Sequence, residues 1–147
     1  MIKVTMVPRE YVPQIWKDVK GHLEKAAEYT YGRYEIDDIF DAIMDYDHIL
    51  WIAYDDTDIK GAVVTNFMNY PRKKYLGMVF CGGEDLAEWK DPMLKMLQHW
   101  AYDSHCDGVE FTGRPGWLKI FKNDGNRAMW HTCELPAANV GLGERNG

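Results

Sequence analysis

Apolar residues recur along this chain with two spacings, one typical of strands and one of helices. At the start, Ile2, Val4 and Met6 alternate with polar residues, which predicts a strand that Pro8 ends. Over residues 9–28 the apolar positions recur every three or four residues, so they share one face of a helix. This stripe, which we expect to be core, consists of Val12, Ile15, Trp16, Val19, Leu23 and Ala26.

A second helix is predicted over residues 35–45, after Gly32 interrupts the first helical pattern. Three apolar strands follow it, at residues 48–54, 59–69 and 73–81. The polar turns DDTD and YPRK separate them. Short turns of this kind join antiparallel neighbours, so we expect a meander.

The rest of the chain predicts two further helices, each lying between strands. After an irregular loop over residues 81–91, CGGEDLAEWKD, Asp91 is the expected N-cap and Pro92 the first residue of a helix that runs to about residue 104. CDGVEFTG and RAMWHTCEL are predicted strands, and a helix between them starts near Pro115 and ends at Gly125.

The predicted order of elements is β α α β β β α β α β. An antiparallel first half followed by a strand-helix-strand crossover is typical of an α/β layered domain. At 147 residues the chain has the size of one domain. We expect that domain to span residues 1–135 and residues 136–147, rich in Pro, Gly and small side chains, to form a flexible tail.

Composition and charge exclude several classes of protein. Hydrophobic residues make up 46% of the chain and aromatic residues 14%, which is too apolar for a disordered protein, while no apolar run is long enough to span a membrane. The first residues lack a secretory signal, so we expect the protein to stay in the cytoplasm. A net charge of −6 disfavours nucleic acid as a partner.

The cysteine and histidine residues do not form a recognisable site in the sequence. Cys81, Cys106 and Cys133 include no C-x-x-C pair, so we expect buried thiols and no disulfide framework or structural zinc site. His99 and His105 lie six positions apart, which places them on different helix faces. We therefore expect no bound metal.

The segment GVEFTGRPGWLKIFKNDGN, residues 108–126, together with the order of elements resembles the GNAT N-acetyltransferase superfamily. In that family the helix after the fifth strand often follows Asn-x-x-Ala-x-x-x-Tyr-x-x-x-Gly-Phe. The same spacing here gives Arg114, Trp117, Phe121, Gly125 and Asn126, so only the glycine is unchanged. The resemblance implies a single GNAT-like domain with a central mixed sheet, helices on both faces and a splayed centre.

Two departures from the family pattern predict a degenerate acetyl-CoA site. The family's tyrosine commonly protonates the departing coenzyme A thiolate, and Phe121 has no proton to give. The family's phosphate-binding turn falls on Gly82 and Gly83, which could form a tight turn after the strand. Four carboxylates, those of Glu84, Asp85, Glu88 and Asp91, face one cation there and should repel the pyrophosphate.

Glu110 is the best candidate for a general base, because the strand before the loop has no carboxylate. A charged residue within an apolar strand is costly to bury unless it is paired or functional. The alternative is structural: Glu110 faces the polar side of its strand or pairs with Arg114 or Lys119.

The resemblance therefore predicts a binding or structural module without a cofactor. Its partner would be a protein or a small amine, bound through the acidic loop with Glu84 and Asp85 and through exposed aromatics, of which Trp89 and Trp117 are candidates. Small degenerate GNAT-like proteins of this kind resemble ones encoded by bacteriophages, some of them virion or host-interaction proteins.

The alternative is an active N-acyltransferase that uses acetyl-CoA. Glu110 would then act as the base through water, the amides of Gly82 and Gly83 would hold the phosphates, and Arg114 would contact one of them. By resemblance, the loop over residues 29–34, which contains Tyr31, would shape the acceptor pocket. The acidic loop would favour a cationic acceptor such as a lysine or a polyamine.

Overall fold

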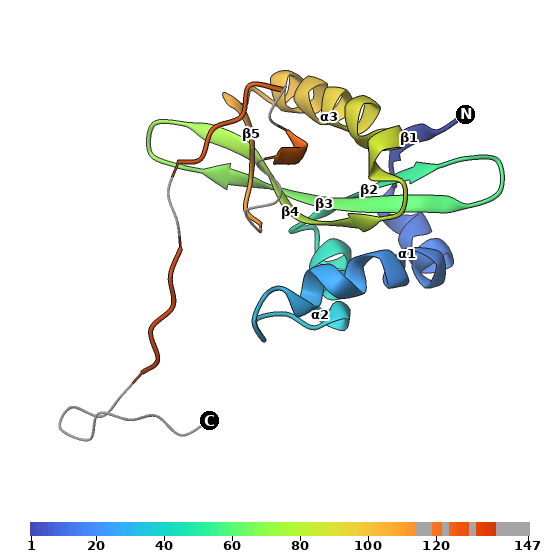
Figure 1. Ribbon diagram of the computed structural model, residues 1–147, viewed down its shortest axis with the longest axis horizontal. Helices are drawn as coiled ribbons and strands as arrows, with labels where there is room; N and C mark the ends of the chain where they lie inside the picture. The colour runs from blue at the N-terminus through green and yellow to red at the C-terminus, as the bar shows by residue number, and fades with distance from the viewer. Residues whose placement is uncertain (114–118, 122–123, 130–131, 138–147) are drawn as a thin grey trace. The chain divides into compact units, whose positions relative to one another are not determined.

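The computed structural model describes residues 1–113, 119–121, 124–129 and 132–137 of the chain. The chain divides into two compact units, Met1–Thr112 and Gly113–Gly147. Among the described residues, the first unit holds a five-stranded sheet in the order β1-β2-β3-β4-β5 (Figure 1). Its strands are β1 Lys3–Met6, β2 Ile49–Tyr54, β3 Ile59–Asn69, β4 Lys74–Gly83 and β5 Gly108–Phe111.

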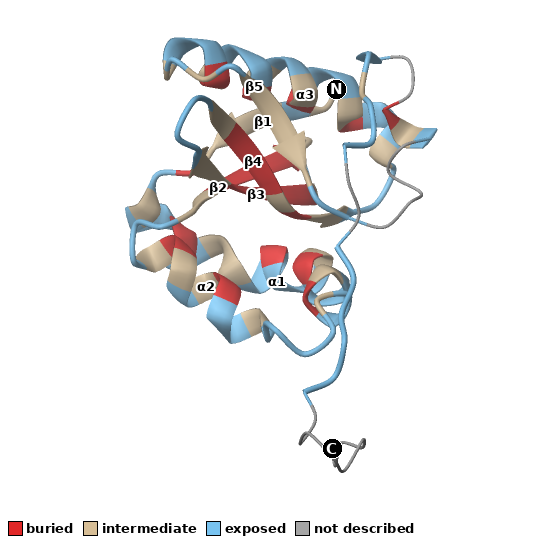
Figure 2. Ribbon diagram, turned by 90° about the vertical axis from the view of Figure 1, so that its left-hand side faces the viewer, coloured by how far each residue is buried: buried red, intermediate tan, exposed pale blue. Residues whose placement is uncertain are grey.

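The sheet is mixed, because β1 to β4 pair antiparallel while β5 pairs parallel to β4. The helices are α1 Val12–Glu28, preceded by a 3-10 turn at Arg9–Tyr11, α2 Ile36–Met44 and α3 Leu86–Asp103. Helices α1 and α2 lie on one face of the sheet and α3 on the other (Figure 2). The prediction of a central mixed sheet with helices on both faces is confirmed.

The face covered by α1 and α2 carries the main hydrophobic core. The predicted stripe of α1 supplies Val12, Val19 and Leu23, all fully buried, and α2 supplies Ile39 and Ile43. They pack with side chains of the sheet, namely Leu50, Ile52, Ala62, Val64 and Phe80. In α2 the carboxylate of Asp38 accepts the Glu35 N–H at 2.8 Å, which satisfies a free amide where the helix begins.

The opposite face is covered by α3, whose buried residues recur every four positions. They are Trp89, Met93, Leu97 and Ala101. Beneath the helix, the ring of Trp100 meets that of Trp51 edge to face at 5.9 Å. The indole N–H of Trp51 donates to the hydroxyl of Thr65 at 2.9 Å, so the fully buried hydroxyl of Thr65 has a partner.

The prediction that this helix begins at Pro92 is wrong, because α3 begins at Leu86 and contains Pro92 in its interior. A proline inside a helix removes one backbone hydrogen bond and usually marks a start or a kink. Here the buried Trp89 lies in the first turns of the helix, and burying so large a side chain offsets the lost bond.

Over the described residues, the prediction of a last strand at residues 127–135 is also wrong. Residues 127–129 and 132–135 form no strand and are exposed, with Met129 59% and Leu135 89% accessible. An alternating pattern forms a strand only where a neighbour supplies hydrogen bonds and a face to bury. Of the predicted helix from Pro115 to Gly125, residues 119–120 are helical, Phe121 lies in a turn and Gly125 has a φ of +79°, while residues 115–118 and 122–123 lie outside the described residues.

Among the described residues, no helix combines the length and the apolar character that crossing a membrane requires.

Two glycines let helices approach the sheet closely from opposite faces. A methyl group on Gly82 would overlap the backbone carbonyl of His22 in α1. A methyl group on Gly61, which lies on the adjacent strand, would overlap the indole ring of Trp89 in α3. Helices α1 and α3 therefore pack against opposite faces of the sheet at positions where the strands have no side chains.

Replacing Gly82 by alanine should lower the free energy of unfolding by about 1–3 kcal/mol, because the new methyl group forces α1 away from β4. Gly21→Ala is the matched control. It lies in α1 with nothing within 4 Å of the added methyl, so it should instead raise stability by about 0.5–1 kcal/mol. Urea denaturation of both variants measures the difference, and a Gly82→Ala protein as stable as the wild type would contradict this packing.

Candidate functional site

Strands β4 and β5 stop pairing halfway along β4. The parallel ladder joins Tyr75 through Met78 of β4 to the four residues of β5, whereas β4 continues to Gly83. At the point where the ladder ends, Val79 is an extra residue in β4, since Val64 pairs with Phe80 and Thr65 with Met78. Bulges of this kind turn a strand away from its neighbour and are frequent beside active sites.

Glu110 lies on β5 beside this divergence, half-buried and in register with Gly77. Its carboxylate Oε1 accepts a hydrogen bond from the hydroxyl of Tyr70 at 2.6 Å. This bond to Glu110 is the main reason that the pKa of the Tyr70 hydroxyl is raised. The sequence did not point to Tyr70, because it lies 40 residues away, in the turn after β3.

The expectation that Gly82 and Gly83 form a turn after the strand is wrong, because both belong to β4. Gly82 is in register with Ala62 and Gly83 with Gly61. Gly83 has a φ of +149°, and the next amide, that of Glu84, donates to the carbonyl of Lys60 at 2.8 Å. Because Gly82 and Gly83 have no side chains, α1 and β3 can lie close to β4 at these positions. The two glycines do not form an open turn that could bind phosphate.

The carboxylates that the sequence placed in a loop lie just before and within the first turns of α3. Glu84, Asp85 and Glu88 are all exposed here. Asp85 is the N-cap residue, with a φ of +53° and no hydrogen bond from its side chain to the helix. Lys90 is the cation of this segment, and its Nζ atom lies 3.2 Å from Oδ1 of Asp91. Carboxylates near a helix N-terminus stabilise the helix, but they also occupy the electrostatic position that a bound phosphate would need.

Trp89 is 1% exposed, so the prediction that it is a surface aromatic is wrong. Its indole N–H donates to the carbonyl of Glu84 at 2.8 Å, which ties the first turn of α3 to the end of β4. The sequence did not show this because Trp89 was placed in a loop. The other predicted aromatic, Trp117, and the predicted phosphate contact, Arg114, lie outside the described residues.

Tyr31 lies between α1 and α2, 83% exposed and with a φ of +56°. Its neighbour Tyr34 contacts Phe80 of β4 edge to face at 5.2 Å. The loop between these helices therefore reaches the strand that diverges from β5. The role of Tyr31 in binding stays a prediction.

The Cys81 thiol, near the end of β4, is poorly suited to act as a nucleophile. Burial raises the pKa of this thiol to about 12, so it stays protonated at neutral pH. In the described segments, no three His, Cys, Asp or Glu side chains come together in a way that could hold a metal ion.

Two polar residues that the sequence did not single out lie on the α1/α2 face. His48 directly precedes β2, and its ring stacks on Phe80 with centroids 6.5 Å apart. Asn66 lies on β3. The Nδ1 atom of His48 and the Oδ1 atom of Asn66 are both buried without a hydrogen-bond partner. Burial lowers the pKa of His48 more than the nearby charge of Asp47 raises it.

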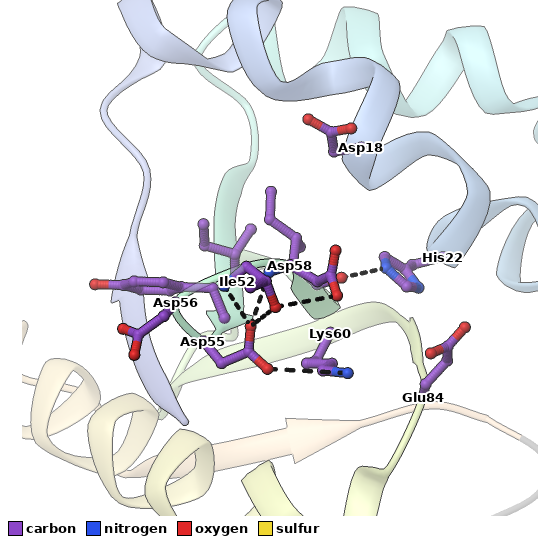
Figure 3. Close-up of a pocket in the computed structure, with 11 residues that line it drawn as sticks. Asp18, His22, Ile52, Asp55, Asp56, Asp58, Lys60 and Glu84 are labelled. Carbon is purple, nitrogen blue, oxygen red and sulfur yellow. Dashed lines mark hydrogen bonds and ion pairs between the residues drawn. The ribbon is translucent and has the colours of Figure 1, made fainter. Parts of the chain in front are cut away.

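A pocket of about 540 Å³ lies at the other end of the sheet, between α1 and the β2–β3 turn (Figure 3). Several of the polar groups that line this pocket form hydrogen bonds within the β2–β3 turn. Asp55 accepts the amides of Thr57 and Asp58 at 2.9 and 2.7 Å, which lowers the pKa of its carboxyl to about 2, the bond from Asp58 having the larger effect. The ring of His22 lies with Nε2 2.8 Å from the carbonyl of Ile59.

The remaining carboxylates give this pocket an acidic lining, contributed by Asp18, Asp56, Asp58 and Glu84. The ion pair between Lys60 and Asp55, at 3.9 Å, offsets part of that charge. Acidic side chains around a polar turn are common on protein surfaces, so the pocket by itself does not identify a ligand.

No protein-family model matches the sequence, and its comparison with curated proteins also finds no match. Solved structures do match. A protein from Clostridium acetobutylicum, named as an acetyltransferase and solved with acetyl-CoA, is 12% identical with a TM-score of 0.64, and the match covers 92% of this chain and 96% of that one.

Two other structures of similar size match in the same way. One from Pyrococcus furiosus, also named as an acetyl transferase, is 14% identical with a TM-score of 0.68 and coverage of 93% and 100%. An aminoglycoside acetyltransferase from an uncultured soil metagenomic sample is 9% identical with a TM-score of 0.70 and coverage of 94% and 99%. The protein thus has the fold of the GNAT-type acetyltransferases.

Proposed function

We propose that this protein is a binding module on a GNAT-like fold that does not use acetyl-CoA as a cofactor. The observation that carries the proposal is the start of α3, where the exposed residues Glu84, Asp85 and Glu88 lie just before or within the first turn, whose amides would have to hold a pyrophosphate. A fold similar to that of enzymes does not by itself imply their chemistry.

Three further observations support the same proposal. The glycines expected to cradle phosphate are part of the sheet, and a methyl group on either would overlap or crowd backbone atoms. Phe121, which stands where the family has a tyrosine, is buried and has no proton to donate. The thiol of Cys81 stays protonated at neutral pH.

The partner in this proposal is a protein or a small amine. Exposed tyrosines between α1 and α2 support a contact surface, since Tyr31 is 83% and Tyr29 46% exposed. Tyrosine supplies a large, rigid contact area at low entropic cost and is enriched in interfaces. A role as a phage virion or host-interaction protein is part of the proposal and is supported by the sequence resemblance alone.

The wild-type protein should show no binding of acetyl-CoA or coenzyme A at ligand concentrations on the order of 1 mM, measured by calorimetry at low salt. A double variant, Glu84→Gln with Glu88→Gln, should show weak but measurable binding of coenzyme A in the same titration, because two charges that repel the phosphates are gone. The gain should shrink as salt is added.

Asp41→Asn provides the matched control for that experiment. Asp41 is an exposed carboxylate on α2, which lies on the other face of the sheet from α3, so its loss should leave coenzyme binding unchanged. Micromolar binding of acetyl-CoA by the wild type would overturn the proposal.

The second candidate function is an acetyl-CoA-dependent N-acyltransferase that acts on a cationic amine. One observation favours it: β4 continues past the end of β5 with a bulge at Val79, which leaves strand edge beside Glu110. A carboxylate in this position could take a proton from an amine through one water molecule. Arg114 keeps its proposed contact with a coenzyme phosphate in this alternative.

If the protein transfers acetyl groups, Glu110→Gln should lower kcat by about a hundredfold or more, because the amide cannot accept the proton. Tyr70→Phe removes the hydrogen bond to Glu110 but keeps the carboxylate, so it should have a smaller effect. Release of free coenzyme A measures turnover. Full activity in Glu110→Gln would exclude Glu110 as the base.

A further inference from the structure

His48 lies between the end of α2 and the start of β2, where a helix and two strands come together. Its backbone N–H donates to the carbonyl of Ala42 in α2 at 3.2 Å. The register of β2 with β3, continued by one position, places His48 opposite Asn66. The imidazole ring stacks on Phe80 of β4, with ring centroids 6.5 Å apart and 28° between the ring planes. Since Phe80 belongs to the core beneath α1 and α2, the His48 ring lies on that face of the sheet.

The loop between α1 and α2, residues 29–35, reaches the same phenylalanine. Tyr34 meets Phe80 edge to face, with ring centroids 5.2 Å apart. Within the loop, the hydroxyl of Thr30 accepts the N–H of Tyr34 at 3.0 Å and donates to the carbonyl of Ala27 at 2.6 Å. These bonds join the loop to the end of α1 but not to the sheet. Phe80 therefore connects the loop and His48 in one aromatic cluster.

The position of the His48 ring favours its neutral form. The Nδ1 atom is buried without a hydrogen-bond partner among the described residues, and so is Oδ1 of Asn66, so the two side chains do not bond to each other. A charged ring in such a position is costly, because neither water nor an acceptor compensates the charge. Burial accordingly lowers the pKa of His48 from its ordinary value of about 6.5, and the opposing charge of Asp47 has a smaller effect.

The elements around His48 carry other groups that can hold a charge or titrate. Neither Phe80, on which the ring stacks, nor Asn66, which lies opposite, is one of them. The groups are Glu35, Asp41, Asp45, Tyr46 and Asp47 on α2 and its ends, Arg9 bonded to the carbonyl of Ile43, Arg33 and Tyr34 in the loop, and Glu110 on β5. Of these, Asp47 is the one whose charge acts measurably on His48.

We propose that His48 is a pH-sensitive switch that holds the α1–α2 loop on the sheet while its ring is neutral and releases the loop when the ring is protonated. A protonated imidazole has two N–H donors and a positive charge, and the buried Nδ1 has no acceptor in the described structure. The charged ring gains by moving towards solvent and the exposed carboxylates of α2. The aromatic cluster that holds Tyr34 then loses one of its three rings.

The direction of the pH dependence follows from the lowered pKa. A histidine with a lowered pKa in the closed form binds a proton less readily there than in the released form. The closed form is therefore favoured above about pH 6.5, and it loses that advantage as the pH falls towards the lowered pKa of His48. Each pH unit in this window favours release by at most about tenfold.

Release of the loop would also change a surface that the proposed function uses. The loop carries Tyr29 and Tyr31, the exposed tyrosines of the proposed contact surface, so acidification should weaken partner binding there. This last step rests on the proposed function. The release itself does not, because it is measured on the protein alone.

NMR of the wild-type protein between about pH 7.5 and about pH 5 tests the switch. The ring signals of His48 should titrate with a pKa below about 6.5. Over the same range, the nuclear Overhauser effect between the rings of Tyr34 and Phe80 should weaken at least about threefold. Binding of coenzyme A by the wild type would contradict the proposed function without affecting this measurement, and a loop that stays closed would contradict the switch alone.

Two variants identify His48 as the cause. His48→Phe keeps a flat ring beside Phe80 but cannot take up a proton, so the contact of Tyr34 with Phe80 should persist at about pH 5. Asp47→Asn removes the charge that raises the pKa of His48, so the transition should move to lower pH. His99→Gln is the matched control. His99 is exposed on α3, on the other face of the sheet, so its loss should leave the transition unchanged.

The proposal is overturned if His48 titrates at or above about pH 6.5, because an acceptor such as Asn66 would then pair with the protonated ring. It is also overturned if His48 titrates while the contact of Tyr34 with Phe80 stays constant, or if the transition persists in His48→Phe. Should His48→Phe fail to fold, the wild-type titration and Asp47→Asn still decide the question. Circular dichroism checks the folding of each variant.

Discussion

The close approach of α1 and α3 to the two faces of the same pair of strands is the constraint on which the rest of the structure depends. Gly82 leaves space for the backbone of α1, and Gly61 leaves space for the ring of Trp89. Larger side chains at either position would separate a helix from the sheet and open voids in a closely packed core. The order of layers, the start of α3 and the end of β4 all follow from this packing.

The same constraint changes the chemistry at the end of β4. In a phosphate-binding turn, glycines serve to bring backbone amides close to an anion. Here Gly82 and Gly83 bring protein backbone close to protein backbone, and the next amide, that of Glu84, is bonded to Lys60. The glycines thus serve packing. The surface at the start of α3 takes its negative charge from the carboxylates that lie there.

On the α1/α2 face, near the divergence of β4 and β5, two polar side-chain atoms are buried without a hydrogen-bond partner. The core ends at Phe80, and beyond it the face carries His48, Asn66 and Glu110. A buried polar atom without a partner, such as Asn66 Oδ1, costs stability. The fold of acetyltransferases and the ligand chemistry of this chain are therefore separate questions.

The sequence by itself determined the order of elements from β1 to β5, the buried stripe of α1 and the acidic segment that follows β4, because local periodicity and local charge decide them. It identified Glu110 but not Tyr70, His48 or Asn66, and it placed Trp89 on the surface and the start of α3 at Pro92. Those features depend on strand register and on contacts between residues far apart along the chain, such as Trp89 with Gly61. Only the tertiary structure brings such residues together, so only it could decide them.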